Sequence, residues 1–159
     1  MSSKLSHIDQ SGQARMVDVT GKAVTRRSAH ASAVISMSAA AMEQLIAGDN
    51  KKGDVLGTAR IAGIMAAKKC SELIPLCHPL GLSSVDVDFD VEQGAGKVIV
   101  RTCCRVDAVT GVEMEALTAV STAALTVYDM IKAVDKTMEI GGIRVTLKDG
   151  GKSGRFEAK

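Results

Sequence analysis

Residues 82 to 106 predict a β-hairpin, and this pattern restricts the chain to folds that contain an antiparallel sheet. Between residues 82 and 91, apolar residues alternate with serine and aspartate, and a second alternating run covers 97 to 106. Alternation of this kind is typical of strands with one buried face. The glycine-rich turn at 93–96 is too short to join anything but antiparallel neighbours. We therefore predict two adjacent antiparallel strands.

Other segments extend this sheet and add helices. Residues 23 to 37 mix β-branched residues with alternating polar positions and predict a first strand. A short helix is expected at 39–47. A second is expected from Asp54, whose carboxylate can cap it, to about Lys69. The last strand is predicted at 137–147.

The longest helix is predicted from Thr110 to Val134. Thr110 followed three residues later by Glu113 matches the capping-box pattern. Apolar residues then recur at steps of three and four, which predicts a face that lies on the sheet. This inner stripe consists of Leu117, Val120, Ala124, Val127, Ile131 and Val134.

A second stripe of the same helix is displaced from the first by roughly 200°, because each residue turns the helix by about 100°. An exposed stripe normally carries many charges, whereas this one and its flanks are rich in small residues. We therefore expect burial against another subunit. The outer stripe consists of Glu115, Thr118, Thr122, Leu125, Asp129 and Lys132.

The order strand, helices, strand, strand, helix, strand predicts an α+β fold. We expect a ferredoxin-like antiparallel four-stranded sheet with the helices packed on one face. A single catalytic domain over residues 1–159 is expected, with flexible ends at 1–14 and 149–159.

The composition limits the partners. Lys plus Arg number 20 against 18 Asp plus Glu, and aromatic residues make up 2% of the chain. Neither the charge nor the stacking surface expected of a nucleic-acid binder is present, so we expect no nucleic-acid partner. No apolar run has the length of a signal peptide or membrane span, so a cytoplasmic protein without membrane contact is predicted.

The four cysteines, Cys70, Cys77, Cys103 and Cys104, show no CxxC pairing. We interpret them as reduced thiols rather than as disulfides or a zinc site. The adjacent Cys103 and Cys104 lie in a predicted strand and should point to opposite faces.

Residues 74 to 80 predict a site loop. Pro75 and Pro79 keep the segment out of regular helix and sheet and hold Cys77 and His78 between them. The alternative is that His78 is a core histidine hydrogen-bonded to the backbone.

Asp129 and Lys132 are three residues apart on the long helix, so an ordinary helix ion pair is one interpretation. A low-dielectric setting would instead bring both pKa values toward the working pH, as acid/base catalysis requires. The lysines of the chain suit an anionic, polyphosphate substrate. The polar candidates for an active site are Lys68, His78, Glu113, Glu115, Asp129 and Lys132, with Lys52 and Lys148 on mobile segments.

Five motifs between Arg15 and Gly154 carry a resemblance. They are Lys52–Val55, Thr58–Ile64, Leu73–Leu80, Gly111–Leu117 and Tyr128–Val134. In this order they closely resemble the family of cyclic pyranopterin monophosphate synthases, the molybdenum cofactor biosynthesis protein C family. Five long motifs are far more specific than one short pattern.

The resemblance implies a reaction. Such enzymes take a 3′,8-cyclised dihydro-GTP, rearrange its purine into a pyranopterin, close a cyclic phosphate and release pyrophosphate. By the family pattern Asp129 is the acid/base residue, Lys132 assists it as proton donor or charge stabiliser, and Lys52 belongs to the same catalytic group.

The resemblance also implies a binding site and an assembly. Substrate-binding residues would be Leu76, Cys77, His78, Glu113, Met114 and Glu115, while Lys52, Lys68 and Lys148 would hold the phosphates. A hexamer built as a trimer of dimers is expected, with sites at the dimer interface. No organic cofactor and no protein-held metal are expected, and any Mg²⁺ would accompany the substrate triphosphate.

Two other functions are compatible with parts of the sequence. A non-catalytic nucleotide- or pterin-binding regulatory module would use the lysines and His78 but would not require Asp129. A P-loop phosphohydrolase is suggested by Gly151-Lys152-Ser153. It is rejected because Thr146 stands where the motif needs its leading glycine, and too few residues follow for a helix.

Overall fold

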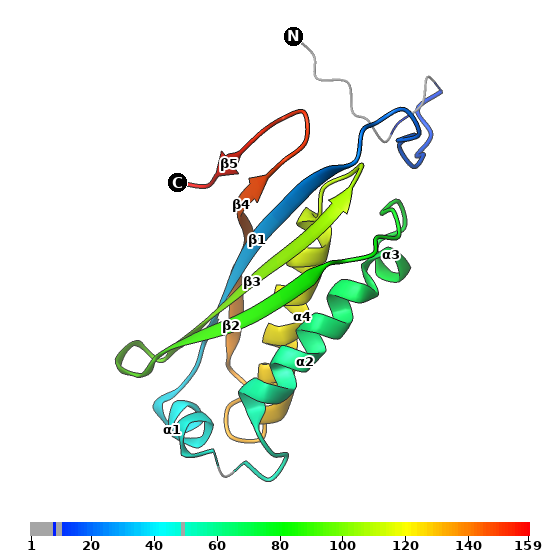
Figure 1. Cartoon of the computed structure of the whole chain (residues 1–159). Helices are drawn as coiled ribbons and strands as arrows, with labels where there is room; N and C mark the ends of the chain where they lie inside the picture. Colours follow the sequence, from blue (N-terminus) through cyan, green and yellow to red (C-terminus); the bar gives the residue numbers. More distant parts are fainter. Residues whose placement is uncertain (1–7, 9–10, 49) are drawn as a thin grey trace.

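The computed structural model describes residues 8, 11–48 and 50–159 and has an α+β architecture. Helices α2 and α4 lie side by side on one face of an antiparallel sheet (Figure 1). The elements follow in the order β1 (Thr25–Ser36), α1 (Ala39–Ala47), α2 (Val55–Lys68), α3 (Cys70–Leu73), β2 (Ser84–Glu92), β3 (Lys97–Ala108), α4 (Glu113–Ile131), β4 (Glu139–Asp149) and β5 (Phe156–Glu157).

The sheet has five strands in the order β2-β3-β1-β4-β5, and every neighbouring pair is antiparallel. The predicted hairpin is confirmed, with Ser84 opposite Arg105 and Glu92 opposite Lys97. The prediction of four strands is wrong, because β5 pairs with the end of β4. A strand of two residues is too short to leave an alternating pattern, so the sequence carried no signal for it.

The predicted caps of the first two helices are confirmed. Ser38 Oγ accepts a hydrogen bond from the backbone nitrogen of Ala41 at 3.3 Å, and Asp54 Oδ1 accepts one from Gly57 at 3.0 Å. Each bond satisfies a helix N-terminal donor that has no partner within its helix. Gly48 ends α1 with φ +69°, a conformation that glycine adopts without a Cβ clash.

The limits of α4 differ from the prediction. The helix begins at Glu113, Val112 occupies the N-cap position, and no side chain caps it, so Thr110 and Glu113 do not form the predicted capping box. The helix ends at Ile131, and Val134 lies beyond it with 46% of its surface exposed. The last strand also runs two residues further than predicted, to Asp149.

The inner stripe of α4 packs on the sheet as predicted, apart from Val134. Val120, Val127 and Ile131 are fully buried, and Leu117 packs against the same core. The facing positions of β1 are mostly alanines, so the helix lies close to the sheet. Along the outer stripe, Leu125, Asp129 and Lys132 are exposed in this chain.

Small residues also let α2 approach α4. A Cβ added at Gly63 would lie 3.0 Å from the carbonyl oxygen of Ala119, 3.2 Å from a methyl group of Val87 and 3.3 Å from the Cβ of Ala123. Because one of these neighbours is helix backbone, the contact leaves no room for a larger side chain.

Asp135 ties the end of α4 to the start of α1. Its carboxylate accepts hydrogen bonds from the backbone nitrogens of Ser38 and Thr137, both at 2.8 Å, and from the Thr137 hydroxyl at 2.7 Å. These bonds, led by the one from the Thr137 hydroxyl, lower the pKa of Asp135 from 3.8 to about 2.

In the part of the chain that the structure describes, no helix combines the length and the apolar character that crossing a membrane requires.

We predict that Gly63→Val lowers the free energy of unfolding by about 1–3 kcal/mol, because the added Cβ already meets the backbone of α4 and carries two further methyl groups. Denaturant unfolding measures the change. Gly141→Val is the matched control, since a Cβ there meets nothing within 4 Å. Equal stability losses in both variants would contradict the close contact.

We predict that acid weakens the fold through Asp135. Its folded pKa is lowered to about 2, so the ionised group stabilises the fold above its ordinary pKa of 3.8, and this contribution is lost as the pH falls from about 4 toward 2. Denaturant unfolding across this range should show a shallower pH dependence for Asp135→Asn than for the parent. A steeper or unchanged dependence would contradict this role.

Candidate functional site

An apolar cavity of about 590 Å³ lies beside the N-terminal end of α4. The loop that follows α3 forms one wall, and the first turn of α4 forms the other. The lining residues are Ala14, Ile74, Pro75, Leu76, Cys77, His78, Thr110, Gly111, Glu113, Met114 and Glu115. The cavity thus collects six of the predicted substrate-binding residues: Leu76, Cys77, His78, Glu113, Met114 and Glu115.

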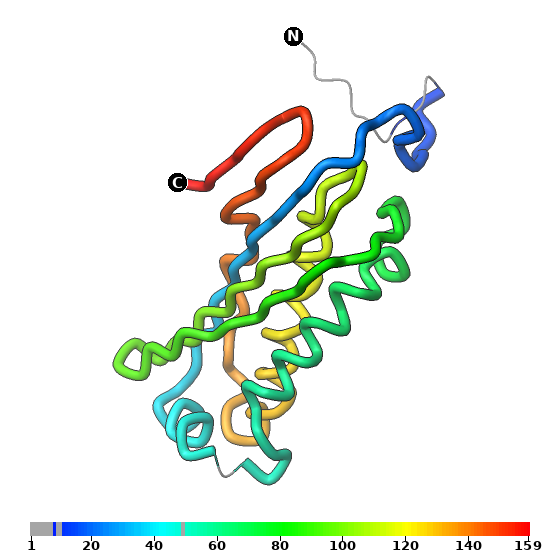
Figure 2. Tube along the Cα trace, viewed as in Figure 1, coloured from blue at the N-terminus to red at the C-terminus, as the bar shows by residue number. Residues whose placement is uncertain are grey.

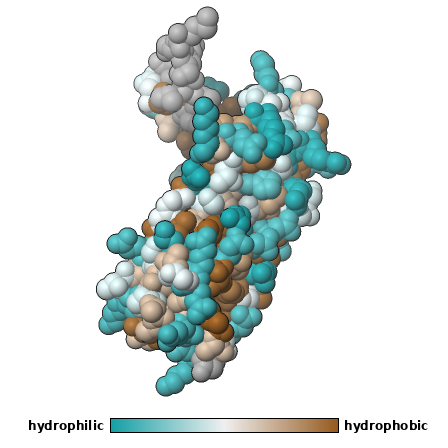
Figure 3. All heavy atoms as spheres, turned by 90° about the vertical axis from the view of Figure 1, so that its left-hand side faces the viewer, coloured by the Kyte–Doolittle hydropathy of each residue, from teal (hydrophilic) through white to brown (hydrophobic). Residues whose placement is uncertain are grey.

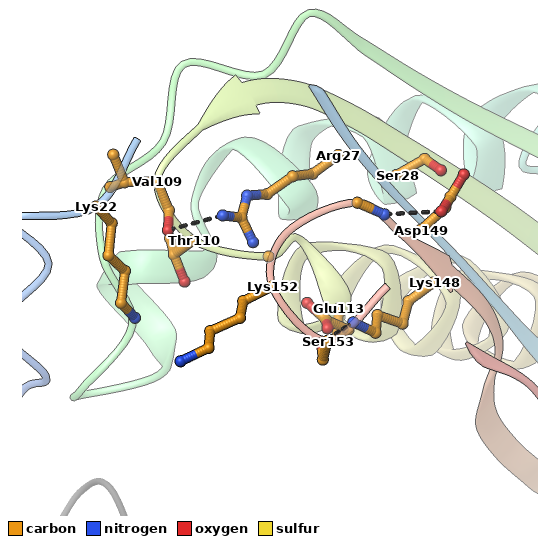
Figure 4. A pocket seen from close by; sticks show the side chains of 12 residues that line it. Lys22, Arg27, Ser28, Val109, Thr110, Glu113, Lys148, Asp149, Lys152 and Ser153 are labelled. Carbon is orange, nitrogen blue, oxygen red and sulfur yellow. Dashed lines mark hydrogen bonds between the residues drawn. The ribbon is translucent and has the colours of Figure 1, made fainter. Parts of the chain in front are cut away.

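A second cavity, of about 750 Å³, adjoins the first and is rich in cations. Figure 4 shows the Lys22 and Lys152 side chains extending toward the same open side of it. Its lining residues are Lys22, Arg27, Ser28, Val109, Thr110, Gly111, Glu113, Lys148, Asp149, Gly150, Lys152 and Ser153. Three residues, Thr110, Gly111 and Glu113, line both cavities, so the two form a continuous binding surface with an apolar and a cationic part.

Backbone contacts hold the cationic cavity in shape. Arg27 donates from Nε to the carbonyl of Ala108 at 2.9 Å and from a terminal nitrogen to that of Val109 at 3.1 Å. Gly150 has φ +93°, and a Cβ at this residue would collide with the carbonyl oxygen of Arg26. Only glycine fits this approach, so the loop that carries Lys152 lies close to the start of β1.

His78 is fixed by the N-terminal segment. Its Nε2 donates a hydrogen bond to the carbonyl of Val17 at 2.9 Å, while the ring lines the apolar cavity. His78 is therefore half-buried, bonded to the backbone as one interpretation expects, and also in contact with a cavity.

Glu115 lies at the floor of the apolar cavity with 2% of its surface exposed. The Cys77 thiol donates to Glu115 Oε1 at 3.5 Å, and Cys70 Sγ lies 3.9 Å from Cys77 Sγ. Burial raises the pKa of Glu115, and burial together with the Glu115 carboxylate raises the pKa of Cys77 to about 12. Cys77 is therefore a neutral thiol near pH 7 and a poor nucleophile.

Glu115, which the sequence placed on the outer stripe of α4 with burial against another subunit, is already buried within the single chain. The loop carrying Cys77 covers this residue, and a contact from a distant segment cannot be read from helical spacing.

Asp129, Lys132 and Lys52 form a separate cluster at the other end of α4. Lys132 Nζ donates to Asp129 Oδ1 at 2.5 Å, and Lys52 Nζ donates to Oδ2 at 3.1 Å and to the Asp129 carbonyl at 2.7 Å. Asn50 supports the loop that carries Lys52 by donating to the carbonyl of Met130 at 3.1 Å.

The electrostatics of this cluster differ from the prediction. The Asp129 side chain is 57% exposed. Hydrogen bonds from Lys132 and Lys52 lower its pKa, and the bond to Asp129 raises that of Lys132. In the single chain both pKa values thus move away from neutrality rather than toward it, because the pair is solvated and the partners stabilise each other's charged form.

The predicted site residues consequently fall into two groups. The ends of α4 lie apart, one beside the loop after α3 and the other beside the loop before α2 (Figure 2). Between Glu113 and Asp129 the helix rises by about 24 Å, at about 1.5 Å per residue. Lys148 lines the cationic cavity, whereas Lys68 is exposed at the end of α2 and lines neither cavity.

The site residues that the sequence did not predict include Lys22, Arg27 and Lys152 of the cationic cavity and Cys70 beneath the apolar one. Lys22 and Arg27 lie far from Lys152 in the chain, so no spacing marks the three as one group. Lys152 had a signal in its glycine-rich surroundings, but the pattern was considered only as a P-loop and rejected.

We predict that Lys148→Ala weakens the binding of inorganic tripolyphosphate by roughly 5- to 30-fold, because it removes one cation from the cationic cavity. Titration calorimetry at two salt concentrations measures the change. Lys97→Ala, an exposed lysine at the start of β3, is the control with unchanged affinity. Similar losses of affinity in both variants would mean that tripolyphosphate binding depends on the net charge of the protein and not on the position of Lys148.

Comparison with known proteins identifies the family of this chain. A family model described as the MoaC family matches residues 16–151. A cyclic pyranopterin monophosphate synthase from Jannaschia sp. (strain CCS1) is 60% identical over 155 residues, which cover 98% of this chain and 95% of that protein. Among solved structures, human carnosine dipeptidase 1 matches with 11% identity over 92% of this chain and 41% of its own. The TM-score of this match is 0.28, which is too low to indicate a shared fold. Because the family model spans most of the chain and the relative spans nearly all of it, the chain belongs to the MoaC family.

Proposed function

We propose that this protein is a cyclic pyranopterin monophosphate synthase of molybdenum cofactor biosynthesis. It converts 3′,8-cyclised dihydro-GTP into cyclic pyranopterin monophosphate and releases pyrophosphate. The observation that carries the proposal is the continuous surface of an apolar and a cationic cavity, which suits a ligand with a heterocycle and a triphosphate. Membership of the MoaC family and the name of the 60% identical relative support it.

The proposed binding mode follows the chemistry of the two cavities. The heterocycle lies among Leu76, Met114 and His78, with Glu115 and Cys77 beneath it as polar groups that orient its edge. The triphosphate lies in the cationic cavity, among basic side chains that include Lys148. Glu113, on the boundary between the cavities, faces the ribose that joins the two parts.

Asp129 and Lys132 are proposed to transfer protons during the rearrangement, with Lys52 stabilising developing negative charge. Within one chain these residues are a helix length away from the cavities. A two-fold axis that pairs α4 helices antiparallel would place the Asp129 end of one chain beside the cavities of its partner. We therefore propose that each active site contains residues from two chains.

Exposed apolar residues support this pairing. In the helical layer, Ile61 is 61% exposed, Met65 54% and Leu125 59%. Such side chains on neighbouring helices favour burial against a second subunit. Burial would also lower the effective dielectric around Asp129 and Lys132 and oppose the pKa shifts that hold in the single chain.

A further apolar area supports contacts between dimers. Figure 3 shows hydrophobic residues gathered in the lower half of the face seen from the left-hand side of Figure 1. On the edge strands β4 and β5, Ile143 is 46% exposed and Phe156 49%. We therefore propose a hexamer built as a trimer of dimers, which would bury both the apolar surface of the helical layer and that on β4 and β5.

We also propose the reaction class, the cofactor requirement, the location and the fold type. The reaction is that of a phosphorus-oxygen lyase with general acid/base catalysis, and it requires no organic cofactor. Any Mg²⁺ accompanies the triphosphate. A cytoplasmic location is expected. The order of β2, β3, β1 and β4 supports a ferredoxin-like classification with β5 as an addition.

We predict that the purified protein releases pyrophosphate from 3′,8-cyclised dihydro-GTP and that Asp129→Asn lowers the rate by about 100- to 10,000-fold, because it removes an acid/base group. A coupled pyrophosphate assay and the product mass measure this. Asp107→Asn, an exposed carboxylate on β3, is the control with unchanged rate. Tight binding without turnover in the parent would favour the regulatory module instead.

We also predict that two inactive variants complement each other. Glu113→Gln and Asp129→Asn alter opposite ends of α4, so mixed dimers would contain one site with neither substitution. Co-refolding the variants should restore part of the parental activity, whereas each variant alone stays inactive. A mixture as inactive as its components, despite subunit exchange shown by native mass spectrometry, would contradict a shared site.

A further inference from the structure

The floor of the apolar cavity contains three side chains that can bind a cation. Cys70, Cys77 and Glu115 offer two sulfur atoms and a carboxylate oxygen that all lie within 4.8 Å of one another. Cys70 starts α3, Cys77 lies in the following loop, and Glu115 comes from the first turn of α4. The group is therefore assembled by the packing of α3 and its loop on α4, and its spacing in the sequence matches no zinc motif.

The distances fit a tetrahedral thiophilic ion. With Zn–S bonds of about 2.3 Å and Zn–O bonds of about 2.0 Å, tetrahedral angles place two sulfurs about 3.8 Å apart and a sulfur and an oxygen about 3.5 Å apart. Cys70 Sγ and Cys77 Sγ are separated by 3.9 Å, and Cys77 Sγ and Glu115 Oε1 by 3.5 Å. Two of the three separations thus already match coordination, and the third, between Cys70 Sγ and the Glu115 carboxylate, lies within 4.8 Å.

An unpartnered atom points to a missing ligand. Only 2% of the surface of Glu115 is exposed. Among the described residues, its Oε2 is a buried side-chain oxygen without a hydrogen-bond partner. A buried carboxylate oxygen without a partner is costly, and the water in the fourth position of a cation bound through Oε1 would donate a hydrogen bond to it. The Thr118 hydroxyl, 3.5 Å from Cys70 Sγ, could donate to the thiolate and support the ligand from outside.

A Cys70–Cys77 disulfide is the competing use of the two sulfurs. It would require them to approach from 3.9 Å to about 2.05 Å, which needs a movement of the loop. It would also leave Glu115 Oε2 without a partner. A cation engages all three side chains at their present separations and is therefore the better fit.

We propose that Cys70, Cys77 and Glu115 form a binding site for one thiophilic divalent cation such as Zn²⁺. Binding releases the thiol protons to solvent, leaves the fourth coordination position to water, and engages two residues of the apolar cavity. The proposal stands whether or not the proposed reaction is correct, because it concerns binding alone. It also differs from the expectation of no protein-held metal that the sequence suggested.

The test uses the reduced, metal-free full chain. Equilibrium dialysis is expected to give one Zn²⁺ per chain. Titration with Co²⁺ is expected to give the visible bands of a tetrahedral site together with a sulfur-to-cobalt charge-transfer band, and Zn²⁺ should displace them. Cys70→Ser and Glu115→Gln should each weaken Co²⁺ binding by at least about tenfold, since each removes a ligand.

Cys103→Ser is the matched control. Cys103 is 7% exposed and has His30 Nε2 at 3.4 Å, so it is a buried thiol with its own possible co-ligand on the other face of the sheet. Its removal should leave the cobalt spectrum unchanged. Loss of the spectrum in this variant but not in Cys70→Ser would overturn the proposal, as would a lack of Zn²⁺ binding by the parent.

A second measurement covers variants that fail to fold. In the parent, Zn²⁺ should slow the alkylation of Cys70 and Cys77 but not that of Cys103, as mapped by peptide mass spectrometry. Equal alkylation rates with and without Zn²⁺ would overturn the proposal. A Cys70–Cys77 disulfide that forms in air and then persists in the presence of reductant, with no Zn²⁺ bound, would overturn the proposal and assign the pair to redox chemistry instead.

Discussion

The close packing of α2 and α4 over the sheet is the contact on which both candidate clusters depend. Gly63 on α2 meets the backbone of α4 at Ala119, and alanines fill much of the interface with β1. Small side chains bring the layers close together, and dense packing then fixes the axial position of each helix. Since α4 carries Glu115 at its start and Asp129 at its end, a shift of this helix would move both.

The two ends of α4 give carboxylates opposite properties. Glu115 is covered by the loop that carries Cys77, and desolvation raises its pKa. Asp129 lies in solvent between two lysines, whose hydrogen bonds lower its pKa. Burial at one end thus disfavours the charged form of the carboxyl group, whereas the two lysines at the other end stabilise it. An active site that contains both requires a second chain, because a rigid helix holds its own ends apart.

The arrangement also gives a physical reason for an assembly. The surface formed by Ile61, Met65 and Leu125 is exposed in the single chain, whereas the polar cluster lies at one end of the same helical layer. Covering this surface would bury apolar area and enclose the cluster together. Stability and the completion of the proposed site would then depend on the same contact between chains.

The sequence by itself determined the four long strands and the helices α1, α2 and α4, the caps at Ser38 and Asp54, the hairpin and the inner stripe of α4, because these follow from local hydrogen bonding and from the periods of helix and strand. Its motifs also identified most residues of the apolar cavity. Tertiary structure alone decided the burial of Glu115, the meeting of Cys70 with Cys77, the gathering of cations from distant segments and the fifth strand. These features depend on contacts between segments far apart in the chain, and no local period records which distant segment will cover a given side chain.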